Sequence, residues 1–370
     1  MTTLAFFDDY PHERGHHPDL IVGLGIAAEA PIYCPDSFLE GRTDARHLPH
    51  RTMVGALCDS LEGRANLQSS YDDAASRGCD AFVNLFLDEN WDSFPIRQDG
   101  LRVAHSLHRP GELTGTLGGV NATKPGDALA VLRSLAGPDL VVVHTAIGEQ
   151  QALQWLPKRN VVRIGWPAAR ELDIRRRFAA APNRPGVGPG TAEPYVLLIG
   201  EALEYKGIHC LLEALDPGPP LRIAGNLAVG GADWLAYEYP KARVTWEPSW
   251  VTRSRLDELV AGAAVIAFPY LAGFDVHGGV SGALVHALTF GKPIVVSEAL
   301  ASQAPKGPSC RVVACGDAQE LRRAIDWALA ESIDLHHAAA DLEAYLVSEH
   351  TYERHVQRLV ELLSEGVGGL

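Results

Sequence analysis

The chain has 370 residues, 46% hydrophobic and 21% charged, which is ordinary for a globular protein long enough for two domains. Its formal net charge of −14 argues against a surface that neutralises nucleic-acid or anionic-lipid phosphates. No run approaches the roughly 20 apolar residues of a membrane span, so we expect a cytoplasmic protein without a transmembrane segment.

The sequence carries no pattern of metal ligands. The six cysteines lack any C-x-x-C pair, and no Asp-x-Asp occurs anywhere in the chain. His12, His16 and His17 have no cysteine or carboxylate at ligand spacing, so we interpret them as part of a solvated loop. We therefore expect no metal site.

Apolar strands alternate with helical stretches through the first half of the chain, which predicts a doubly wound parallel sheet. The predicted strands are 4–7, 31–33, 81–87, 101–105 and 140–144, with helices from about Pro18 and at 71–77 and 126–135. The segment 23–28 matches a dinucleotide fingerprint, but Pro18 stands where the preceding strand should be, which argues against a nicotinamide-dependent oxidoreductase.

Polar residues follow one of these predicted strands. Ligands of doubly wound sheets bind beyond the carboxyl ends of the strands, and His105, Ser106, His108 and Arg109 fall at such an end. His105 is the candidate functional residue of this half.

A Pro/Gly-rich segment, residues 179–194, is the best domain boundary, because four prolines and three glycines between Pro182 and Pro194 prevent regular structure. It separates an N-terminal domain, 1–178, from a C-terminal domain, 195–340. The basic run 175–177 before it is interpreted as a solvated helix face.

The alternation resumes after this linker. Strands are predicted at 195–199, 221–224, 244–246, 265–268, 294–296 and 311–314, and helices at 208–215, 252–261, 281–290 and 317–330. Asp317 and Thr252 are the expected N-caps of their helices. Residues 341–364 have the apolar face of one further helix.

The loop between the strands 265–268 and 294–296 is poor in side chains. Gly278, Gly279, Val280, Ser281 and Gly282 open a helix, and small residues at a helix N-terminus let an anion approach unpaired backbone N–H groups. This pattern predicts a phosphate site, although an ordinary tight turn has the same composition.

Several segments together resemble a known family. GEALEYKG after a strand, LRIAGN, and SG-x3-HA-x3-GKP resemble the donor domain of retaining GT-B glycosyltransferases of the sucrose-synthase/mannosyltransferase-like group. RVAHSLH and DLVVVHTAIGEQQAL are similar to segments of its N-terminal domain. The resemblance covers about residues 100–330, and residues 1–99 only by architecture.

The resemblance implies an α/β protein with two Rossmann-like domains whose parallel sheets face each other across a cleft. The N-terminal domain would bind a small-molecule or glycan acceptor, and residues 341–370 would cross back to it. The co-substrate would be a nucleoside-diphosphate sugar, with UDP or GDP favoured, and no cofactor is implied. Transfer would proceed with retention and without a metal.

The resemblance also assigns residues. Lys206, in the Y-K-G turn, would bind the donor diphosphate, and His105 would contact the donor sugar or the reacting centre. Glu201 stands where the family has an arginine, and Gly278 and His286 stand where it has two glutamates. The implied donor-binding set is Gly200, Glu201, Lys206, Asn226, Val251, His277, Gly278, Gly279, Val280, Ser281, Gly282 and His286.

These departures leave alternatives open. His286 can still hydrogen-bond a ribose, and Asp275 or His277 can supply the polar group that Gly278 does not have. The same two-domain fold hosts sugar-nucleotide epimerases and phosphorylases. Loss of both glutamates and the arginine is also the pattern expected of a degenerate protein that binds sugar nucleotides without catalysis.

Overall fold

The computed structural model describes residues 2–8, 17–40, 42–48, 51–53, 61–85, 100–108, 110, 140–154, 156, 158–180, 193–200, 204–225, 237–247, 251–331 and 340–364. They form two compact units. Unit 1 comprises Met1–Arg170, Val276–Val280 and Glu349–Leu370; unit 2 comprises Glu171–Asp275 and Ser281–Ser348. Most of the predicted linker, residues 181–192, lies outside the described residues.

Unit 1 contains a seven-stranded sheet in the order β3-β2-β1-β4-β5-β6-β7, with every neighbouring pair parallel. The described residues of β1, β2, β4 and β6 are all buried, as expected of strands covered on both faces. The strands are β1 (Leu4–Phe7), β2 (Ile32–Cys34), β3 (Arg51–Met53), β4 (Ala81–Asn84), β5 (Arg102–Leu107), β6 (Leu140–Val143) and β7 (Val161–Arg163).

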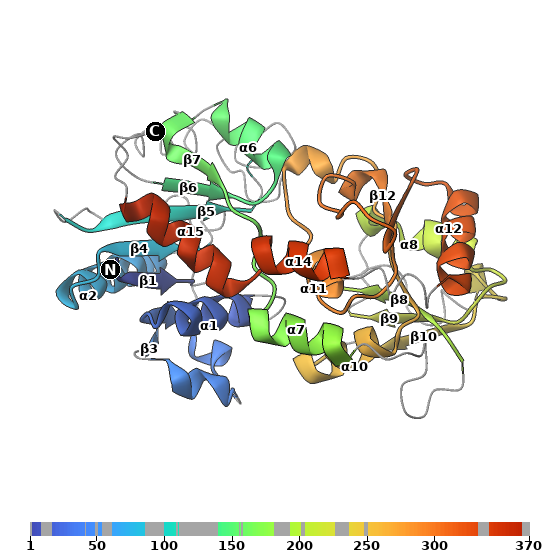
Figure 1. Ribbon diagram of the computed structural model, residues 1–370, viewed down its shortest axis with the longest axis horizontal. Helices are drawn as coiled ribbons and strands as arrows, with labels where there is room; N and C mark the ends of the chain where they lie inside the picture. Colours follow the sequence, from blue (N-terminus) through green and yellow to red (C-terminus); the bar gives the residue numbers. More distant parts are fainter. Residues whose placement is uncertain are drawn as a thin grey trace. The chain divides into compact units, whose positions relative to one another are not determined.

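The helices of unit 1 include α1 (His17–Ala28), α2 (Leu61–Ser76), α6 (Ala146–Leu153) and α15 (Tyr352–Ser364), and α1 packs against α15 (Figure 1). Gly23 lies inside α1, where a Cβ atom would overlap the ring of Tyr352. The glycines of the dinucleotide-like segment therefore serve helix packing, and they do not form a strand-to-helix turn.

Unit 2 contains a six-stranded, all-parallel sheet in the order β10-β9-β8-β11-β12-β13. Its strands are β8 (Val196–Ile199), β9 (Leu221–Ala224), β10 (Val244–Glu247), β11 (Val265–Phe268), β12 (Ile294–Ser297) and β13 (Cys310–Val313). Its helices are α7 (Glu171–Ala180), α8 (Ile208–Ala214), α10 (Arg253–Gly262), α11 (Gly282–Leu288), α12 (Ala318–Ala330) and α14 (Ala340–Glu349).

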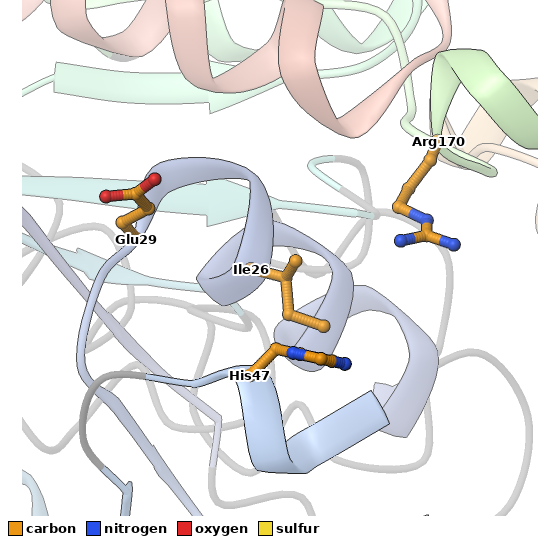
Figure 2. Close-up of a pocket in the computed structure, with 4 residues that line it drawn as sticks. All are labelled: Ile26, Glu29, His47 and Arg170. Carbon is orange, nitrogen blue, oxygen red and sulfur yellow. The ribbon is translucent and has the colours of Figure 1, made fainter. Parts of the chain in front are cut away.

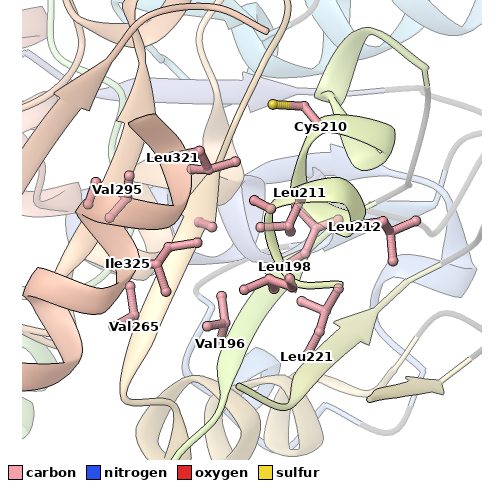
Figure 3. Packing of buried hydrophobic residues seen from close by; sticks show 14 of the residues in the cluster. Val196, Leu198, Cys210, Leu211, Leu212, Leu221, Val265, Val295, Leu321 and Ile325 are labelled. Atoms are coloured by element: carbon pink, nitrogen blue, oxygen red, sulfur yellow. The ribbon is translucent and has the colours of Figure 1, made fainter. Parts of the chain in front are cut away.

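The core of unit 2 lies between its sheet and the helices α8 and α12 (Figure 3). Leu211 and Leu212 of α8, together with Leu321 and Ile325 of α12, pack onto the β-branched and leucine side chains of the strands. Burial of such apolar area is the main force that holds α8 in place. The turn that precedes α8 is consequently fixed at its helical end.

Within the described residues the predicted alternation of strands and helices is confirmed, and most differences concern element ends. The predicted helix 126–135 and the last two residues of the predicted strand 81–87 lie outside the described residues. Helix α2 begins ten residues before the predicted start, and α11 ends at Leu288 instead of Phe290. Helix α7, which includes Arg177, belongs to unit 2, whereas the sequence boundary at 178 placed it in the N-terminal domain.

The predicted single C-terminal helix is wrong. Two helices, α14 and α15, meet at His350 and Thr351, where the Thr351 hydroxyl accepts the Arg354 backbone N–H at 3.1 Å and so caps α15. The extended backbone at this break bridges Ala169 of unit 1. No helix in the described residues is long and apolar enough to span a membrane.

The N-cap of α12 offers a test of the fold. The Asp317 carboxylate accepts the Glu320 backbone N–H at 2.8 Å. Asp317→Ala should lower the free energy of unfolding by about 1 kcal/mol, measured by urea titration. The control Asp326→Ala removes an exposed ion pair with Arg322 on the same helix and should cost no more than about 0.5 kcal/mol. Equal losses would contradict the capping role.

Candidate donor site

The turn that carries Lys206 lies at the carboxyl end of β8. Gly200 follows that strand, and Lys206 ends a short 3₁₀ turn (Glu204–Lys206) directly before α8. Gly207 has a φ of +70°, and a Cβ atom there would overlap the carbonyl oxygen of Pro269. The backbones at Gly207 and Pro269 approach so closely that only glycine fits at position 207. This contact holds the neighbouring Lys206 against the end of β11.

Lys206 is a buried residue, with 8% of its surface exposed. Its Nζ lies 5.9 Å from the centroid of the Tyr270 ring, at the limit of a cation–π contact. A Cβ atom on Gly200 would lie 2.8 Å from this Nζ and 3.9 Å from the Cβ of Ala283. Lys206, Gly200 and the first turn of α11 are therefore adjacent, as the resemblance implies for a diphosphate site.

Ser281 is the N-cap of α11. Its hydroxyl accepts the Leu284 backbone N–H at 3.3 Å and lies 3.2 Å from the Tyr270 hydroxyl, while its own N–H donates to Gln303 at 2.8 Å. Burial holds the pKa of Tyr270 above its usual range, so the phenol is neutral. Because α11 has only seven residues, Lys206 supplies more of any anion attraction here than the helix dipole does.

Gly278 and its neighbours pack with α6 in unit 1. The Thr145 hydroxyl donates to the Gly278 carbonyl at 2.7 Å and accepts the Gly148 N–H at 2.9 Å. Gly278 has a φ of +66°, and a Cβ atom there would overlap the Gln151 amide oxygen and lie 2.8 Å from the Cα of Gly148. This backbone has no room for the glutamate that the resemblance leads one to expect.

Both ring nitrogens of His286 face protein groups. Nδ1 accepts from the Arg253 guanidinium at 2.9 Å, and Nε2 lies 3.3 Å from the Asp257 carboxylate. Burial, reinforced by Arg253, lowers the pKa of His286 to about 4, so the ring is neutral near pH 7. A neutral ring that accepts through Nδ1 carries its proton on Nε2, toward Asp257.

Arg177 extends this cluster from α7. It donates to the Thr289 hydroxyl at 2.6 Å and to Asp257 at 3.0 Å, and its guanidinium lies 4.2 Å from the centroid of the Phe290 ring. Its side chain is only 19% exposed. The interpretation of the basic run as a solvated face is therefore wrong for Arg177, although Arg175 is exposed.

The ends of β8, β9 and β10 lie close together. Gly225 has a φ of +139°, and a Cβ atom there would overlap the carbonyl oxygen of Gly200. The Trp246 indole donates to the Gly225 carbonyl at 3.0 Å. Beyond β10, Val251 is half-buried ahead of α10.

The remaining residues of the implied donor-binding set differ in their burial. Gly279 is buried, while Val280 and Gly282 are half-buried. Glu201, Asn226 and the side chain of His277 lie outside the described residues.

His105 lies within β5 of unit 1, between Asn84 of β4 and Val141 of β6, and is 1% exposed. The strand continues to Leu107, so the first histidine beyond its end is His108. The structure thus places His108, and not His105, in the strand-end position that the sequence analysis associated with ligand binding.

Aromatic side chains surround His108. Its ring stacks on His144 at 5.2 Å between centroids and meets Trp166 edge-on at 4.6 Å. His144 donates through Nδ1 to the Ile164 carbonyl at 3.0 Å and accepts the Ser106 hydroxyl through Nε2 at 2.8 Å. Burial lowers the pKa of His144 to about 3, so this ring is neutral near pH 7.

The structure also pairs Asp8 with His17, which the sequence analysis missed. Asp8 directly follows β1, and His17 opens α1; the carboxylate lies 3.1 Å from Nδ1, and both residues are buried. The solvated-loop interpretation is wrong for His17, and His12 and His16 lie outside the described residues. An acidic residue directly after an apolar strand was the available signal. No three potential ligands among the described residues could hold a metal ion.

Unit 1 also has an open pocket of about 430 Å³. Figure 2 shows Ile26 and Glu29 at the end of α1, with His47 below and Arg170 opposite. Its charged groups are of mixed sign, and Ile26 belongs to the dinucleotide-like segment 23–28, which is helical here.

Residues 193–331 match the family model described as glycosyl transferases group 1. Among solved structures, sucrose-phosphate synthase from Thermosynechococcus elongatus is similar at 17% identity and a TM-score of 0.67, with 99% of each chain covered. The Anabaena protein HepE in complex with UDP and glucose is similar at 14% identity and a TM-score of 0.65, covering 98% of this chain and 100% of that one.

A glycosyltransferase from Rickettsia africae ESF-5 is similar at 10% identity and a TM-score of 0.67, covering 100% of this chain and 99% of that one. No curated protein matches significantly. At these identities the similarity establishes the fold, which is the α/β GT-B fold that the resemblance implied. The predicted fold class is thus confirmed.

The Lys206 turn predicts a stability effect. Gly207→Ala should lower the free energy of unfolding by at least about 2 kcal/mol, because strain at positive φ adds to overlap with the Pro269 carbonyl. Gly273→Ala is the matched control: its φ is +101°, but nothing lies within 4 Å of the added Cβ, so about 1 kcal/mol is expected. Equal losses in urea titration would contradict the tight turn.

The buried imidazoles predict a pH effect. His355 donates to the Gly165 carbonyl at 3.2 Å, and burial lowers its pKa to about 4. Between pH 6.5 and about 4, His355 is protonated in the unfolded chain but not in the folded protein. The free energy of unfolding therefore falls as the pH drops through that window. The loss is on the order of 3 kcal/mol for one such group.

His355→Asn keeps a donor for Gly165 but cannot titrate, so the pH dependence of the free energy of unfolding between about pH 6.5 and 4 should become shallower. The control His209→Asn alters an exposed histidine and should leave that slope unchanged. An unchanged slope in His355→Asn would show that the ring is solvated in the folded protein.

Proposed function

We propose that the chain is a cytoplasmic, hexosyltransferase-type glycosyltransferase that moves a sugar from a nucleoside diphosphate to a small-molecule or glycan acceptor. The observation that carries the proposal is the buried residue Lys206, whose ammonium group lies beside Gly200 and the first turn of α11. The match of residues 193–331 to group 1 glycosyl transferases supports it, because that segment contains these residues.

Cleavage of the bond between sugar and diphosphate develops negative charge on the leaving group. A preorganised cation in a site shielded from water stabilises that charge more in the transition state than in the ground state. Lys206 supplies such a cation beside Gly200 and the first turn of α11. We propose that this contact makes a metal unnecessary and that transfer retains the anomeric configuration.

The donor base would lie beyond the ends of β9 and β10, near Trp246 and Val251, where the resemblance expects a base-contacting loop. UDP is favoured over GDP because HepE, a structural neighbour, was solved with UDP and glucose. We propose no cofactor. The acceptor would bind unit 1 at the carboxyl edge of its sheet, where Asp8, His17 and His108 are found.

A catalytically inactive sugar-nucleotide-binding protein is the second candidate. The observation that favours it is Gly278, whose positive φ and proximity to Gly148 exclude the carboxylate that the resemblance places at that position. Such a protein would bind the nucleotide through Lys206 without turning over the donor.

The direct test is a panel of UDP-, GDP-, ADP- and dTDP-sugars, scored by thermal stabilisation and by slow hydrolysis or transfer. Lys206→Ala should cost roughly 2–4 kcal/mol of transition-state stabilisation in kcat/KM, the scale of one preorganised charge contact. The control Lys241→Ala removes an exposed lysine of the same unit and should leave kcat/KM unchanged.

The outcomes separate the candidates. Turnover that depends on Lys206 supports the transferase, whereas nucleotide binding that depends on Lys206 without any turnover supports the inactive binding protein. Unchanged turnover in Lys206→Ala would remove Lys206 from the site. Indifference to every sugar nucleotide would overturn both candidates.

A further inference from the structure

We propose that Arg253 is a second phosphate-binding cation of the donor site and that His286 and Asp257 are the residues that position it. The proposal rests on the proposed function, because the phosphate is that of the nucleotide donor. It assigns His286 a different role from the ribose contact expected from the sequence.

The location of Arg253 follows from contacts within unit 2. Ala283 and His286 are three residues apart and so lie on the same face of α11. A Cβ atom on Gly200 would lie close to both the Lys206 ammonium and Ala283, so Ala283 is near Lys206. His286, one helical turn further along α11, contacts Arg253. Lys206 and Arg253 therefore flank one face of α11.

Arg253 is the first residue of α10, directly after the loop from the carboxyl end of β10. That end is also where Trp246 reaches the Gly225 carbonyl. Ligands of parallel sheets bind at this edge, and a side chain that is 37% exposed here can still meet one. The position suits the phosphate nearer the nucleoside, with Lys206 at the other phosphate.

A network of neighbouring side chains fixes the guanidinium of Arg253. Its Nη2 donates to His286 Nδ1 at 2.9 Å, and its Nε lies 3.2 Å from the Asp257 carboxylate. Asp257 is itself held by Arg177 at 3.0 Å. His286 offers Nδ1 to Arg253 and presents Nε2 to Asp257, so its ring orients the arginine and has no second acceptor for a ribose hydroxyl.

Phosphate is the ligand that this chemistry fits. A guanidinium is a planar donor without acceptors, and it matches phosphate oxygens in pairs. The Asp257 carboxylate is shared between two guanidinium groups, those of Arg253 and Arg177, with Asp173 acting on Arg177 from its own helix. A glutamate at position 286 would add a negative charge beside Arg253, whereas the neutral imidazole adds none.

The first experiment measures binding of UDP, GDP and inorganic pyrophosphate to the full chain by calorimetry. Arg253→Gln should weaken the affinity for whichever nucleotide binds, and the affinity for pyrophosphate, by about 10- to 100-fold. Arg255→Gln is the matched control, because Arg255 lies on the same helix but pairs with the carboxylates of Glu247 and Glu258, and its binding should equal wild type. Circular dichroism confirms that each variant folds.

The second experiment tests the positioning role of His286. His286→Gln keeps an acceptor for Arg253 and a donor for Asp257, so pyrophosphate affinity should stay within about threefold of wild type. His286→Glu supplies the residue type that the resemblance expects, yet it should weaken pyrophosphate at least about tenfold. If His286 had a purely structural role, His286→Gln and His286→Glu, whose side chains have the same shape, would weaken pyrophosphate binding equally.

The proposal is overturned if Arg253→Gln weakens binding of the nucleotide but not of pyrophosphate. It is also overturned if Arg255→Gln weakens pyrophosphate binding as much as Arg253→Gln does, or if His286→Glu binds pyrophosphate as well as wild type. If the protein binds no nucleotide but binds pyrophosphate in a manner that depends on Arg253, the anion site is supported and only the proposed function is overturned. A wild-type protein that binds neither overturns both.

Discussion

The position of the buried residue Lys206 is the constraint on which the carboxyl edge of the sheet in unit 2 depends. A cation with 8% of its residue exposed needs space beside it, and Gly200 supplies that space because any side chain there would meet Nζ. It needs a fixed backbone as well, and Gly207 supplies it by lying against the Pro269 carbonyl. The core under α8 then holds the turn in place, so packing far from the edge sets the position of one charge.

Much of this could be predicted from sequence, because apolar runs such as 265–268 and 294–296 identify buried parallel strands, and the expected caps Asp317 and Thr252 are correct. The failures lie where tertiary contacts outweigh local pattern. The break at His350 and Thr351 has no proline or glycine to announce it, and it forms because Thr351 bridges Ala169. No spacing in the sequence indicates that α7 brings Arg177 to Asp257.

The individual roles of site residues were harder to predict than their grouping. Spacing from the GKP motif located position 286 correctly on α11, but the partners Arg253 and Asp257 come from another helix and are invisible to a motif. In the same way, His105 and His108 are equivalent in the pattern RVAHSLH, and only the length of β5 distinguishes an interior position from the strand end. Burial then decides protonation, since desolvation outweighs a neighbouring carboxylate at His286.

Gly148 and Gly278 lie in contact, and the Thr145 hydroxyl donates to the Gly278 carbonyl. Neither position has room for a side chain, since a Cβ on Gly148 would lie 2.9 Å from the Gly278 carbonyl oxygen and a Cβ on Gly278 would lie 2.8 Å from the Gly148 Cα. Substitutions at the two positions should therefore have coupled effects. A carboxylate at 278 requires more than one substitution, since the loop must also leave the left-handed conformation and separate from α6. The lack of a carboxylate at position 278 is therefore imposed by the backbone geometry of two segments, and a change of one side chain does not remove that constraint.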